Sequence, residues 1–213
     1  MRQDVFFQPD SSWTVPEVLP QFAPDETIAI DLETYDPNLL INGPGWATGN
    51  GHIVGVGVAS KSWSGYLPIR HVGGGNLDEA IVMRWLKNVL STQRSVIFHN
   101  ALYDVGWLKR EGIDIQGQVL DTIIAAPLLD ENRFSYSLDS LGSFYCNETK
   151  DETLLQDAAL TFGVNPKSEM YKLSANLVLL FLVVIYPTAC KLVVRLVLHK
   201  VLHILQVVYT SHS

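Results

Sequence analysis

The sequence predicts an α/β fold in which helices flank a mixed β-sheet. Three observations predict it: strand-like runs follow one another early in the chain, later segments alternate between helix and strand patterns, and turn-forming residues separate them. Strands that pair as a meander and then alternate with helices give a mixed sheet with helices packed on it. With 47% hydrophobic and 17% charged residues, the chain has the composition of a globular protein.

The predicted strands are short apolar runs rich in β-branched residues. They cover residues 27–32 (TIAIDL), 52–60 (HIVGVGVAS), 65–71 (GYLPIRH), 95–98 (SVIF) and the pair Val119-Leu120. Pro68 cannot donate a backbone hydrogen bond, which places the third strand at an edge or a bulge. Residues 36–51 are rich in turn formers and are expected to form a loop.

Helices are predicted where apolar residues recur with helical spacing. The clearest lies at 77–90, with apolar residues at 77, 81, 82, 85, 86, 89 and 90. Asn76 is its expected N-cap. Further helices are predicted at 101–110, where Gly112 follows the end, and at 122–129, 137–144 and 152–162.

Charge divides the chain unevenly. The net charge of −7 argues against a protein that coats nucleic acid by charge alone, although it permits a local groove or acids that bind metal. All 22 acidic residues lie at or before Glu169, so residues 1–169 carry −11 and residues 170–213 carry +4. We therefore expect a proline-rich, loosely ordered lead-in at 1–26, a domain at 27–176 and a divergent apolar tail at 177–213.

Cysteine content and the N-terminus indicate a cytoplasmic protein. Cys146 and Cys190 are too few for a disulfide framework or a zinc site with four cysteines, and free thiols suit a reducing compartment. The first residues hold no basic region followed by an apolar run, so we expect no signal peptide.

Asp31 and Glu33 stand at the end of the first predicted strand. Because side chains alternate along a strand, both point to the same face. Neighbouring carboxylates repel each other, and a divalent cation between them relieves the repulsion. A D-x-E pair is by itself a weak signal, for which a solvated surface pair is the commoner explanation.

A second carboxylate position follows the strand at 95–98. Asp104 falls one helical turn after Asn100, where it can project over the sheet edge at which the first strand also ends. Three carboxylates meeting there would form an oxygen-rich site suited to Mg²⁺ or Mn²⁺. For Asp104 alone, the simpler explanation is an acid in the first turn of a helix.

Taken together, these motifs resemble the DnaQ-like 3′–5′ exonucleases of the DEDD superfamily, in particular the proofreading domains of phage and bacterial family A DNA polymerases. The resemblance spans about residues 27–178. It rests on IAIDLE (28–33), HNALYD (99–104), DTIIAAPLLD (121–130), YSLDSL (136–141) and NPKSEMYKL (165–173).

The resemblance implies a ribonuclease H-like fold and metal-dependent removal of nucleotides from the 3′ ends of single-stranded DNA. Two Mg²⁺ or Mn²⁺ ions would be the cofactors, and no nucleotide cofactor is implied. A polymerase domain acting in trans is an implied partner. The implied catalytic and metal-ligating residues are Asp31, Glu33 and Asp104, with Glu33 also orienting the attacking water.

Other residues of these motifs have expected roles outside the chemistry. Leu32, Asn100 and Tyr103 are expected to contact the substrate, although aromatic residues at helical spacing, such as Tyr103 and Trp107, are more often core. Asp121 is expected to cap its helix. His99 is expected to lie beside the site. His71 and Gly73–Gly75 could form a phosphate cradle, but a plain turn is favoured because no G-x-x-x-x-G-K pattern is present.

The third motif of the family, Y-x-x-x-D, is missing. In register, Phe181 replaces its tyrosine and Ile185 its aspartate, and a shifted match places Cys190 at the aspartate position. We therefore expect weak or no activity, and a tail of non-homologous sequence from a shifted reading frame or a truncated gene. The apolar stretch 177–190 is shorter than the about 20 residues of a membrane span, so the domain is not expected to cross a membrane.

Three alternatives stay open. The chain can be a binding module that grips DNA ends without cutting them. It can be a protein that associates with a membrane or a partner through its apolar tail, which carries a polar stripe at 191, 195, 199 and 203. Its substrate can be RNA, because the same fold and motifs serve ribonucleases.

Overall fold

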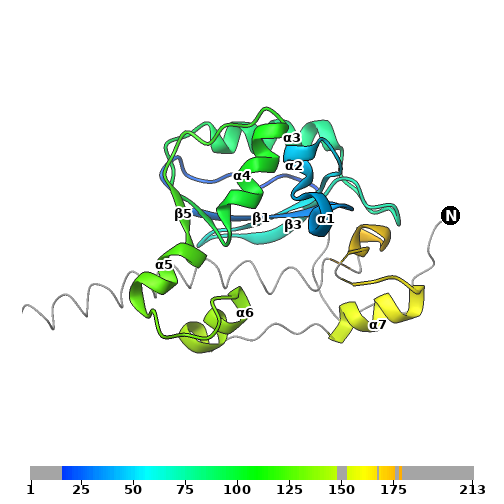
Figure 1. Ribbon diagram of the computed structural model, residues 1–213. Coiled ribbons are helices and arrows are strands. Elements are labelled where there is room, and N and C mark those ends of the chain that lie inside the picture. Colours follow the sequence, from blue (N-terminus) through cyan, green and yellow to red (C-terminus); the bar gives the residue numbers. More distant parts are fainter. Residues whose placement is uncertain (1–15, 148–152, 167, 176–177, 179–213) are drawn as a thin grey trace, which may run out of the picture.

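The computed structural model describes residues 16–147, 153–166, 168–175 and 178 (Figure 1). The predictions for residues 1–15 and for most of the tail lie outside the described residues. Within the described part, no helix is both long enough and apolar enough to cross a membrane.

A single mixed sheet forms the centre of the molecule, as predicted. Its strand order is β3-β2-β1-β4-β5. β1 pairs with β2 and β2 with β3 in antiparallel fashion, whereas β4 is parallel to both β1 and β5. The strands are β1 (Ile28–Tyr35), β2 (His52–Ala59), β3 (Ser64–Pro68), β4 (Val96–Phe98) and β5 (Val119–Asp121).

Helices cover both faces of the sheet. α3 and α4 lie on one face, and α5, α6 and α7 lie on the other side of it (Figure 1). The helices are α1 (Leu39–Asn42), α2 (Gly45–Thr48), α3 (Glu79–Leu90), α4 (Ala101–Arg110), α5 (Thr122–Leu129), α6 (Leu138–Leu141) and α7 (Thr153–Phe162). A turn of π-helix (Gly142–Cys146) follows α6, and a 3-10 turn (Met170–Lys172) follows α7.

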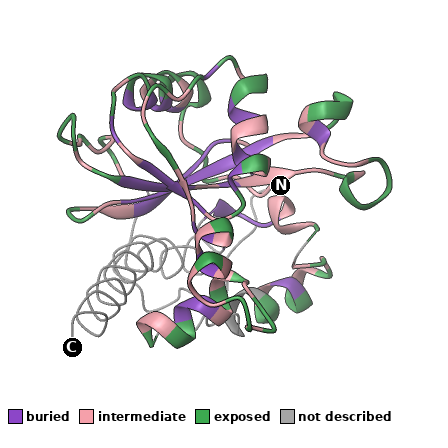
Figure 2. Cartoon of the chain, turned by 60° about the vertical axis from the view of Figure 1, so that its left-hand side comes forward, coloured by how far each residue is buried: buried purple, intermediate pink, exposed green. Residues whose placement is uncertain are grey.

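The sheet divides the core into two layers, and among the described residues β2, β3 and β4 are almost entirely buried (Figure 2). Alternate residues of β1 face opposite layers. Ile28, Ile30 and Leu32 pack with α3 and α4 in the larger cluster. Ala29 faces the smaller cluster on the other face, which includes Val178. Asp31 and Glu33 therefore point toward the second layer.

The predicted elements match the observed ones closely, with two corrections. The loop 36–51 contains the one-turn helices α1 and α2. The N-cap of α3 is Asp78, whose side chain accepts the Ile81 N–H, so the prediction of Asn76 was wrong. The side chain of Asn76 instead bonds both the N–H and the carbonyl of His71. Pro68 does lie in an edge strand, as predicted.

The described part of the lead-in packs against the domain instead of remaining loose. Pro20 accepts a hydrogen bond from the Trp85 indole at 2.8 Å. The Phe22 ring lies 6.2 Å from the Trp85 ring and 6.3 Å from the Trp63 ring. Residues 16–26 are therefore part of the outer wall over α3.

Candidate exonuclease site

The two carboxylates of β1 lie side by side on one face of the sheet. Asp31 is paired across the strands with Gly57, and Glu33 with Gly55. Both carboxylate residues are half-buried. Because these cross-strand neighbours have no side chains, another part of the fold can approach this part of β2, and the Tyr66 side chain fills the space above Gly55.

Asp104 reaches β1 from the first turn of α4. Its Oδ1 accepts the Leu32 N–H at 2.9 Å, and the residue is only 3% exposed. β1 pairs with β4 only through Ile28 and Ala29, so beyond them its edge amides need other partners. Asp104 supplies one of these partners and thereby bonds Leu32, the residue between Asp31 and Glu33 in the sequence.

The electrostatics of Asp104 indicate that the three carboxylates share one environment. Burial, and next the negative charge of Asp31, raise the pKa of Asp104 well above its usual range, and Glu33 adds to the rise. A group whose ionisation is opposed in this way gains from a nearby cation. The oxygen-only set Asp31, Glu33 and Asp104 therefore fits Mg²⁺ or Mn²⁺ in donor chemistry.

The carboxylates are neighbours without being closely grouped. Among the residues that the structure describes, no three His, Cys, Asp or Glu side chains are gathered tightly enough to hold a metal ion. Repulsion between like charges favours such spacing. The assignment of Asp31, Glu33 and Asp104 as metal ligands thus remains a prediction, supported by their common location.

The structure restricts how Leu32 can meet a substrate. Its side chain is 5% exposed and lies in the larger core cluster, and its N–H is bonded to Asp104. In a strand, the C=O of a residue points the same way as its N–H. A substrate contact through Leu32 is thereby limited to this carbonyl, on the edge of β1 that faces α4.

Asn100 and Tyr103, the other predicted substrate contacts, differ in accessibility. Asn100 is exposed at the start of α4. The Tyr103 hydroxyl donates to Asp36 Oδ2 at 2.9 Å and lies 2.8 Å from the Thr34 hydroxyl. Burial raises the pKa of Tyr103 to about 12. Its hydroxyl is therefore engaged inside the protein, which leaves only its ring for a substrate contact.

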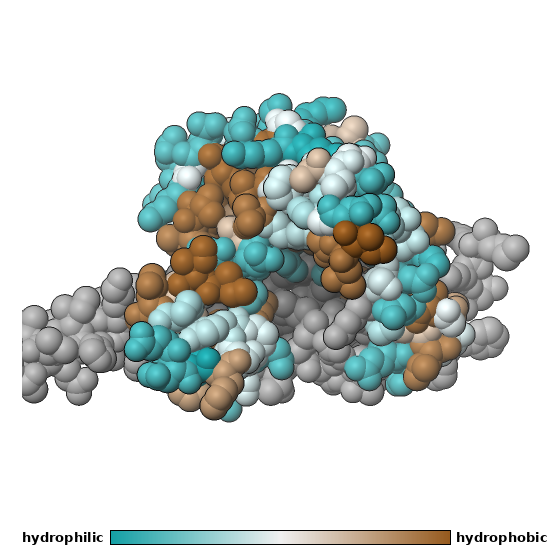
Figure 3. Space-filling view, viewed as in Figure 1, coloured by the Kyte–Doolittle hydropathy of each residue, from teal (hydrophilic) through white to brown (hydrophobic). Residues whose placement is uncertain are grey.

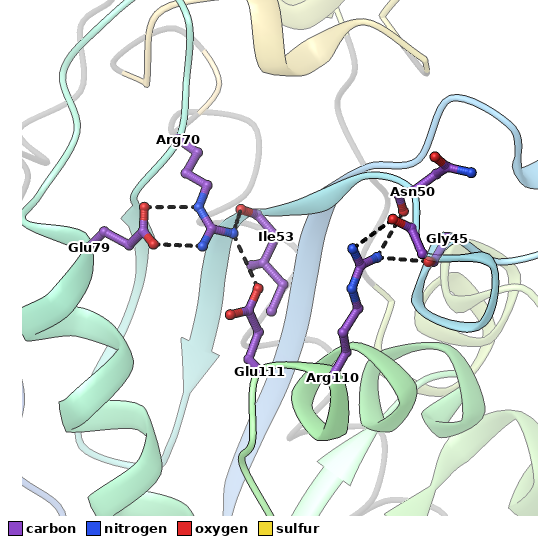
Figure 4. Close-up of polar contacts among 8 residues, drawn as sticks. Gly45, Asn50, Ile53, Arg70, Glu79, Arg110 and Glu111 are labelled. Atoms are coloured by element: carbon purple, nitrogen blue, oxygen red, sulfur yellow. Dashed lines mark hydrogen bonds and ion pairs between the residues drawn. The ribbon is translucent and has the colours of Figure 1, made fainter.

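Arginine side chains fasten the loops around α4 (Figure 4). Arg110 donates to carbonyls of the β1–β2 loop at 2.7–3.0 Å, those of Gly45, Gly49 and Asn50. Arg70 binds both oxygens of Glu79 and also reaches Glu111 and the Ile53 carbonyl. Through Arg110, the β1–β2 loop is thereby held to α4, the helix that carries Asp104.

A buried tyrosine–histidine pair lies on the carboxylate face and was not expected from the sequence. The Tyr66 hydroxyl is 2.8 Å from Nε2 of His71, and Nδ1 of His71 is 3.1 Å from the Leu173 carbonyl. A carbonyl only accepts, so Nδ1 carries the proton and the Tyr66 hydroxyl donates to Nε2. Burial lowers the pKa of His71 to about 4, in agreement with a neutral ring. Burial, followed by the charges of Glu33 and Asp31, raises the pKa of Tyr66 well above its usual range.

The three-glycine turn after His71 packs against residues 171–175, a distant segment of the chain. The Val72 N–H donates to the Tyr171 carbonyl at 2.9 Å. A Cβ atom on Gly73 would lie 2.4 Å from the Ser174 nitrogen. The phosphate-cradle alternative does not hold, because backbone fills the space beside Gly73, whereas the interpretation as a turn agrees with the structure.

Replacing Gly73 by alanine is expected to destabilise the protein by roughly 1–3 kcal/mol, because the new methyl group would overlap the Ser174 backbone. The Ala175 N–H, which donates to the Gly74 carbonyl, should then exchange faster with solvent. Denaturant unfolding and amide exchange measure both effects. Val72→Ala, at a residue 73% exposed, is the control and should change stability by less than about 0.5 kcal/mol. Equal stability of the two variants would contradict the close contact between Gly73 and the Ser174 backbone.

Comparison with known proteins identifies the family of the chain. The model of a 3′–5′ exonuclease family matches residues 58–171, which is just over half of the chain and includes Asn100 and Asp104. Asp31 and Glu33 precede the matched region. The chain therefore belongs to this 3′–5′ exonuclease family.

The curated relatives agree with that assignment, and the structural neighbours share the fold. A DNA-directed DNA polymerase of Pseudomonas phage M6 is 35% identical over 185 residues, which are 84% of this chain and 28% of the polymerase. RNase D of Trypanosoma brucei (TM-score 0.59, 18% identity) covers 81% of this chain and 58% of its own. NrnC of Brucella melitensis, bound to pGG (TM-score 0.54, 15% identity), covers 81% of this chain and 72% of its own.

These similarities confirm two predictions. The ribonuclease H-like fold is the fold of these solved nucleases. The resemblance to the proofreading domains of family A DNA polymerases is supported by the family match and by the phage polymerase. The chain spans between 15% and 28% of the length of the curated polymerases that it matches.

Proposed function

We propose that this chain is a metal-dependent 3′–5′ exonuclease of the proofreading type, which removes nucleotides from the 3′ ends of single-stranded DNA. The observation that carries the proposal is the buried Asp104 carboxylate, which accepts the Leu32 N–H between Asp31 and Glu33. Membership of the exonuclease family supports the reaction class. Nucleic acid as the partner is supported by the same family and by the phage polymerases.

In this proposal Asp31, Glu33 and Asp104 would hold Mg²⁺ or Mn²⁺, which would activate water and stabilise the charge of the departing 3′ oxygen. Glu33 would orient the attacking water through its carboxylate. The Leu32 carbonyl and the exposed Asn100 side chain would position the terminal nucleotide.

Two exposed apolar groups suit contact with the unpaired bases of a strand end. Figure 3 shows two apolar groups on this side of the molecule, one over α1 and one over α5, with hydrophilic residues between them. Exposed apolar side chains make up these groups, namely Leu39, Leu40 and Ile41 on α1, and Ile124 and Leu128 on α5. Contact with aromatic and apolar side chains stabilises a bound base irrespective of the nucleic-acid sequence.

The polarity of degradation tests this function. With Mg²⁺ or Mn²⁺, a 5′-labelled single-stranded DNA should shorten stepwise, and a 3′-labelled one should release labelled mononucleotide first. A matched RNA oligonucleotide distinguishes DNA from RNA as the substrate. Release from the 5′ end, or degradation that survives EDTA, would contradict the proposal.

Restoring the third motif is expected to increase the activity. No acidic residue follows Glu169, so the fourth carboxylate of the family is missing and we expect the chain to be slow. The double substitution Phe181→Tyr/Ile185→Asp should raise the rate of 3′ release by about 10²-fold, the scale of one strong transition-state contact. Phe181→Tyr alone is the control, since it restores no ligand. A soluble double variant no faster than this control would show that the missing carboxylate does not limit the rate.

A second candidate function is binding to DNA ends without cleavage. It is favoured by the absence of acids after Glu169 and by the loose spacing of the carboxylates in the described part of the chain. Binding of a 3′ single-stranded end that is equally tight with and without EDTA, by a protein with no nuclease activity, would select this function.

A further inference from the structure

The turn between β4 and α4 adopts a backbone conformation that needs external support. Asn100 has φ 77° and ψ 53°, the left-handed region that residues other than glycine adopt only in a minority of cases, asparagine more readily than most. No side chain of its own caps the helix, since Asn100 makes no cap hydrogen bond. The turn nevertheless sets the direction of α4 and so the place of Asp104.

The carboxylate of Asp121 supplies that support. Asp121 is the last residue of β5 and is paired with Phe98 of β4. Its Oδ1 accepts the Asn100 N–H at 3.0 Å, and its Oδ2 accepts the Ala101 N–H at 2.8 Å. The same Oδ1 accepts the Ile123 N–H at 3.0 Å, which is the cap of α5 expected from the sequence. One carboxylate therefore accepts backbone N–H groups at the starts of both α4 and α5.

Thr122, the next residue after Asp121, bonds the residues that precede Asn100. The buried Thr122 hydroxyl donates to the Phe98 carbonyl at 3.1 Å and lies 2.7 Å from Nδ1 of His99. Because its proton is used on Phe98, the Thr122 oxygen accepts from Nδ1–H, which fixes the tautomer of His99. Burial lowers the pKa of His99, so the ring is held neutral in this contact.

We propose that Asp121 and Thr122 are positioning residues of the candidate site: they lock the Asn100 turn and thereby set Asp104 against β1 and Asn100 toward the substrate. α4 is then tied at both sides, to β5 through Asp121 and to β1 through the Asp104–Leu32 bond. Asp121 accepts three N–H groups and is thus occupied as a structural acceptor, not as the missing fourth metal ligand. The inference rests on the proposed function for its catalytic consequence, but its structural part stands separately.

The test is Asp121→Asn in the full chain. An amide has one carbonyl oxygen and an NH₂ group that cannot accept, so it cannot receive both the Asn100 and the Ala101 N–H as the carboxylate does. We expect amide exchange at these two residues to accelerate at least tenfold, and Mn²⁺ affinity measured by calorimetry to fall about tenfold. The kcat for 3′ release should fall while KM for DNA changes little. Asp130→Asn, at the other end of α5, is the matched control and should leave every readout unchanged.

A second substitution distinguishes whether Asp121 acts by fixing the Asn100 turn or only by capping α5. Glycine adopts the left-handed conformation without strain, so adding Asn100→Gly to Asp121→Asn should recover most of the Mn²⁺ affinity. If Asp121→Asn does not fold, Thr122→Val compared with Thr122→Ser, which keeps the hydroxyl, makes the same comparison. Unchanged exchange at Asn100 together with unchanged Mn²⁺ affinity, or no recovery by glycine, would overturn the inference. Faster exchange at Asn100 in a chain whose wild type binds no Mn²⁺ would overturn the proposed function and support the structural lock.

Discussion

Asp104→Asn is expected to make the metal-free protein more stable and to remove its nuclease activity. The asparagine oxygen can still accept the Leu32 N–H, but the buried negative charge is gone. Because the pKa of Asp104 is raised in the folded state, the folded protein binds this proton more tightly than the unfolded chain does. The stability of the wild type therefore falls as pH rises above the unfolded pKa of about 4.

Thermal unfolding in EDTA between pH 4.5 and 8 measures this difference. The melting temperature of Asp104→Asn should exceed that of the wild type by roughly 5 °C at pH 8, which corresponds to about 1–2 kcal/mol. The difference should shrink toward pH 4.5. Added Mn²⁺ should stabilise the wild type more than the variant, and 3′ release should drop at least about 10²-fold. A variant that is less stable than the wild type in EDTA at pH 8 would contradict a buried, unfavourable charge.

Trp107→Ala is expected to cause the largest loss of stability. Trp107 is fully buried in the larger core cluster, with the Arg110 guanidinium 5.2 Å from its ring centre and the Tyr103 ring 6.4 Å away. Truncating a buried tryptophan costs about 3–5 kcal/mol. At about 2–4 °C per kcal/mol, the melting temperature should fall by roughly 10 °C.

The same substitution decides between a core role and base stacking for Trp107. Leu102→Ala, on the same helix at a residue 74% exposed, is the control and should change stability by less than about 0.5 kcal/mol. A Trp107→Ala protein as stable as this control, but with a raised KM for DNA, would mean that the ring stacks on a base rather than supporting the core.

Elements with strong local patterns could be predicted from the sequence. β2 lies where its apolar, β-branched run predicted a strand, and α4 and α5 lie where helices were predicted. The short helices α1 and α2 could not be predicted, because a single turn has too few residues to show a helical period. For α3, Asn76 was the predicted N-cap, but its side chain accepts the His71 N–H, and Asp78 caps the helix instead.

The candidate site shows the same division between local and distant information. The strand position of Asp31 and Glu33 follows from alternation, which also places the Leu32 side chain on the opposite face, a signal that argued against a side-chain contact with substrate. The roles of Asp121 and His71 depend on partners about 20 and 100 residues away, since they bond Asn100 and Leu173. No local pattern encodes such pairings.

We propose that Asp31, Glu33 and Asp104 form a metal-dependent nuclease site. The most direct test compares 3′ nucleotide release from single-stranded DNA in Mn²⁺ by the wild type and by Asp31→Ala/Glu33→Ala. Glu17→Ala/Asp25→Ala, which removes two exposed acids elsewhere, controls for the change in net charge. We predict slow, EDTA-sensitive release by the wild type and the control, and none by the site variant. Equal release by all three proteins, or none by folded wild type, would contradict the claim.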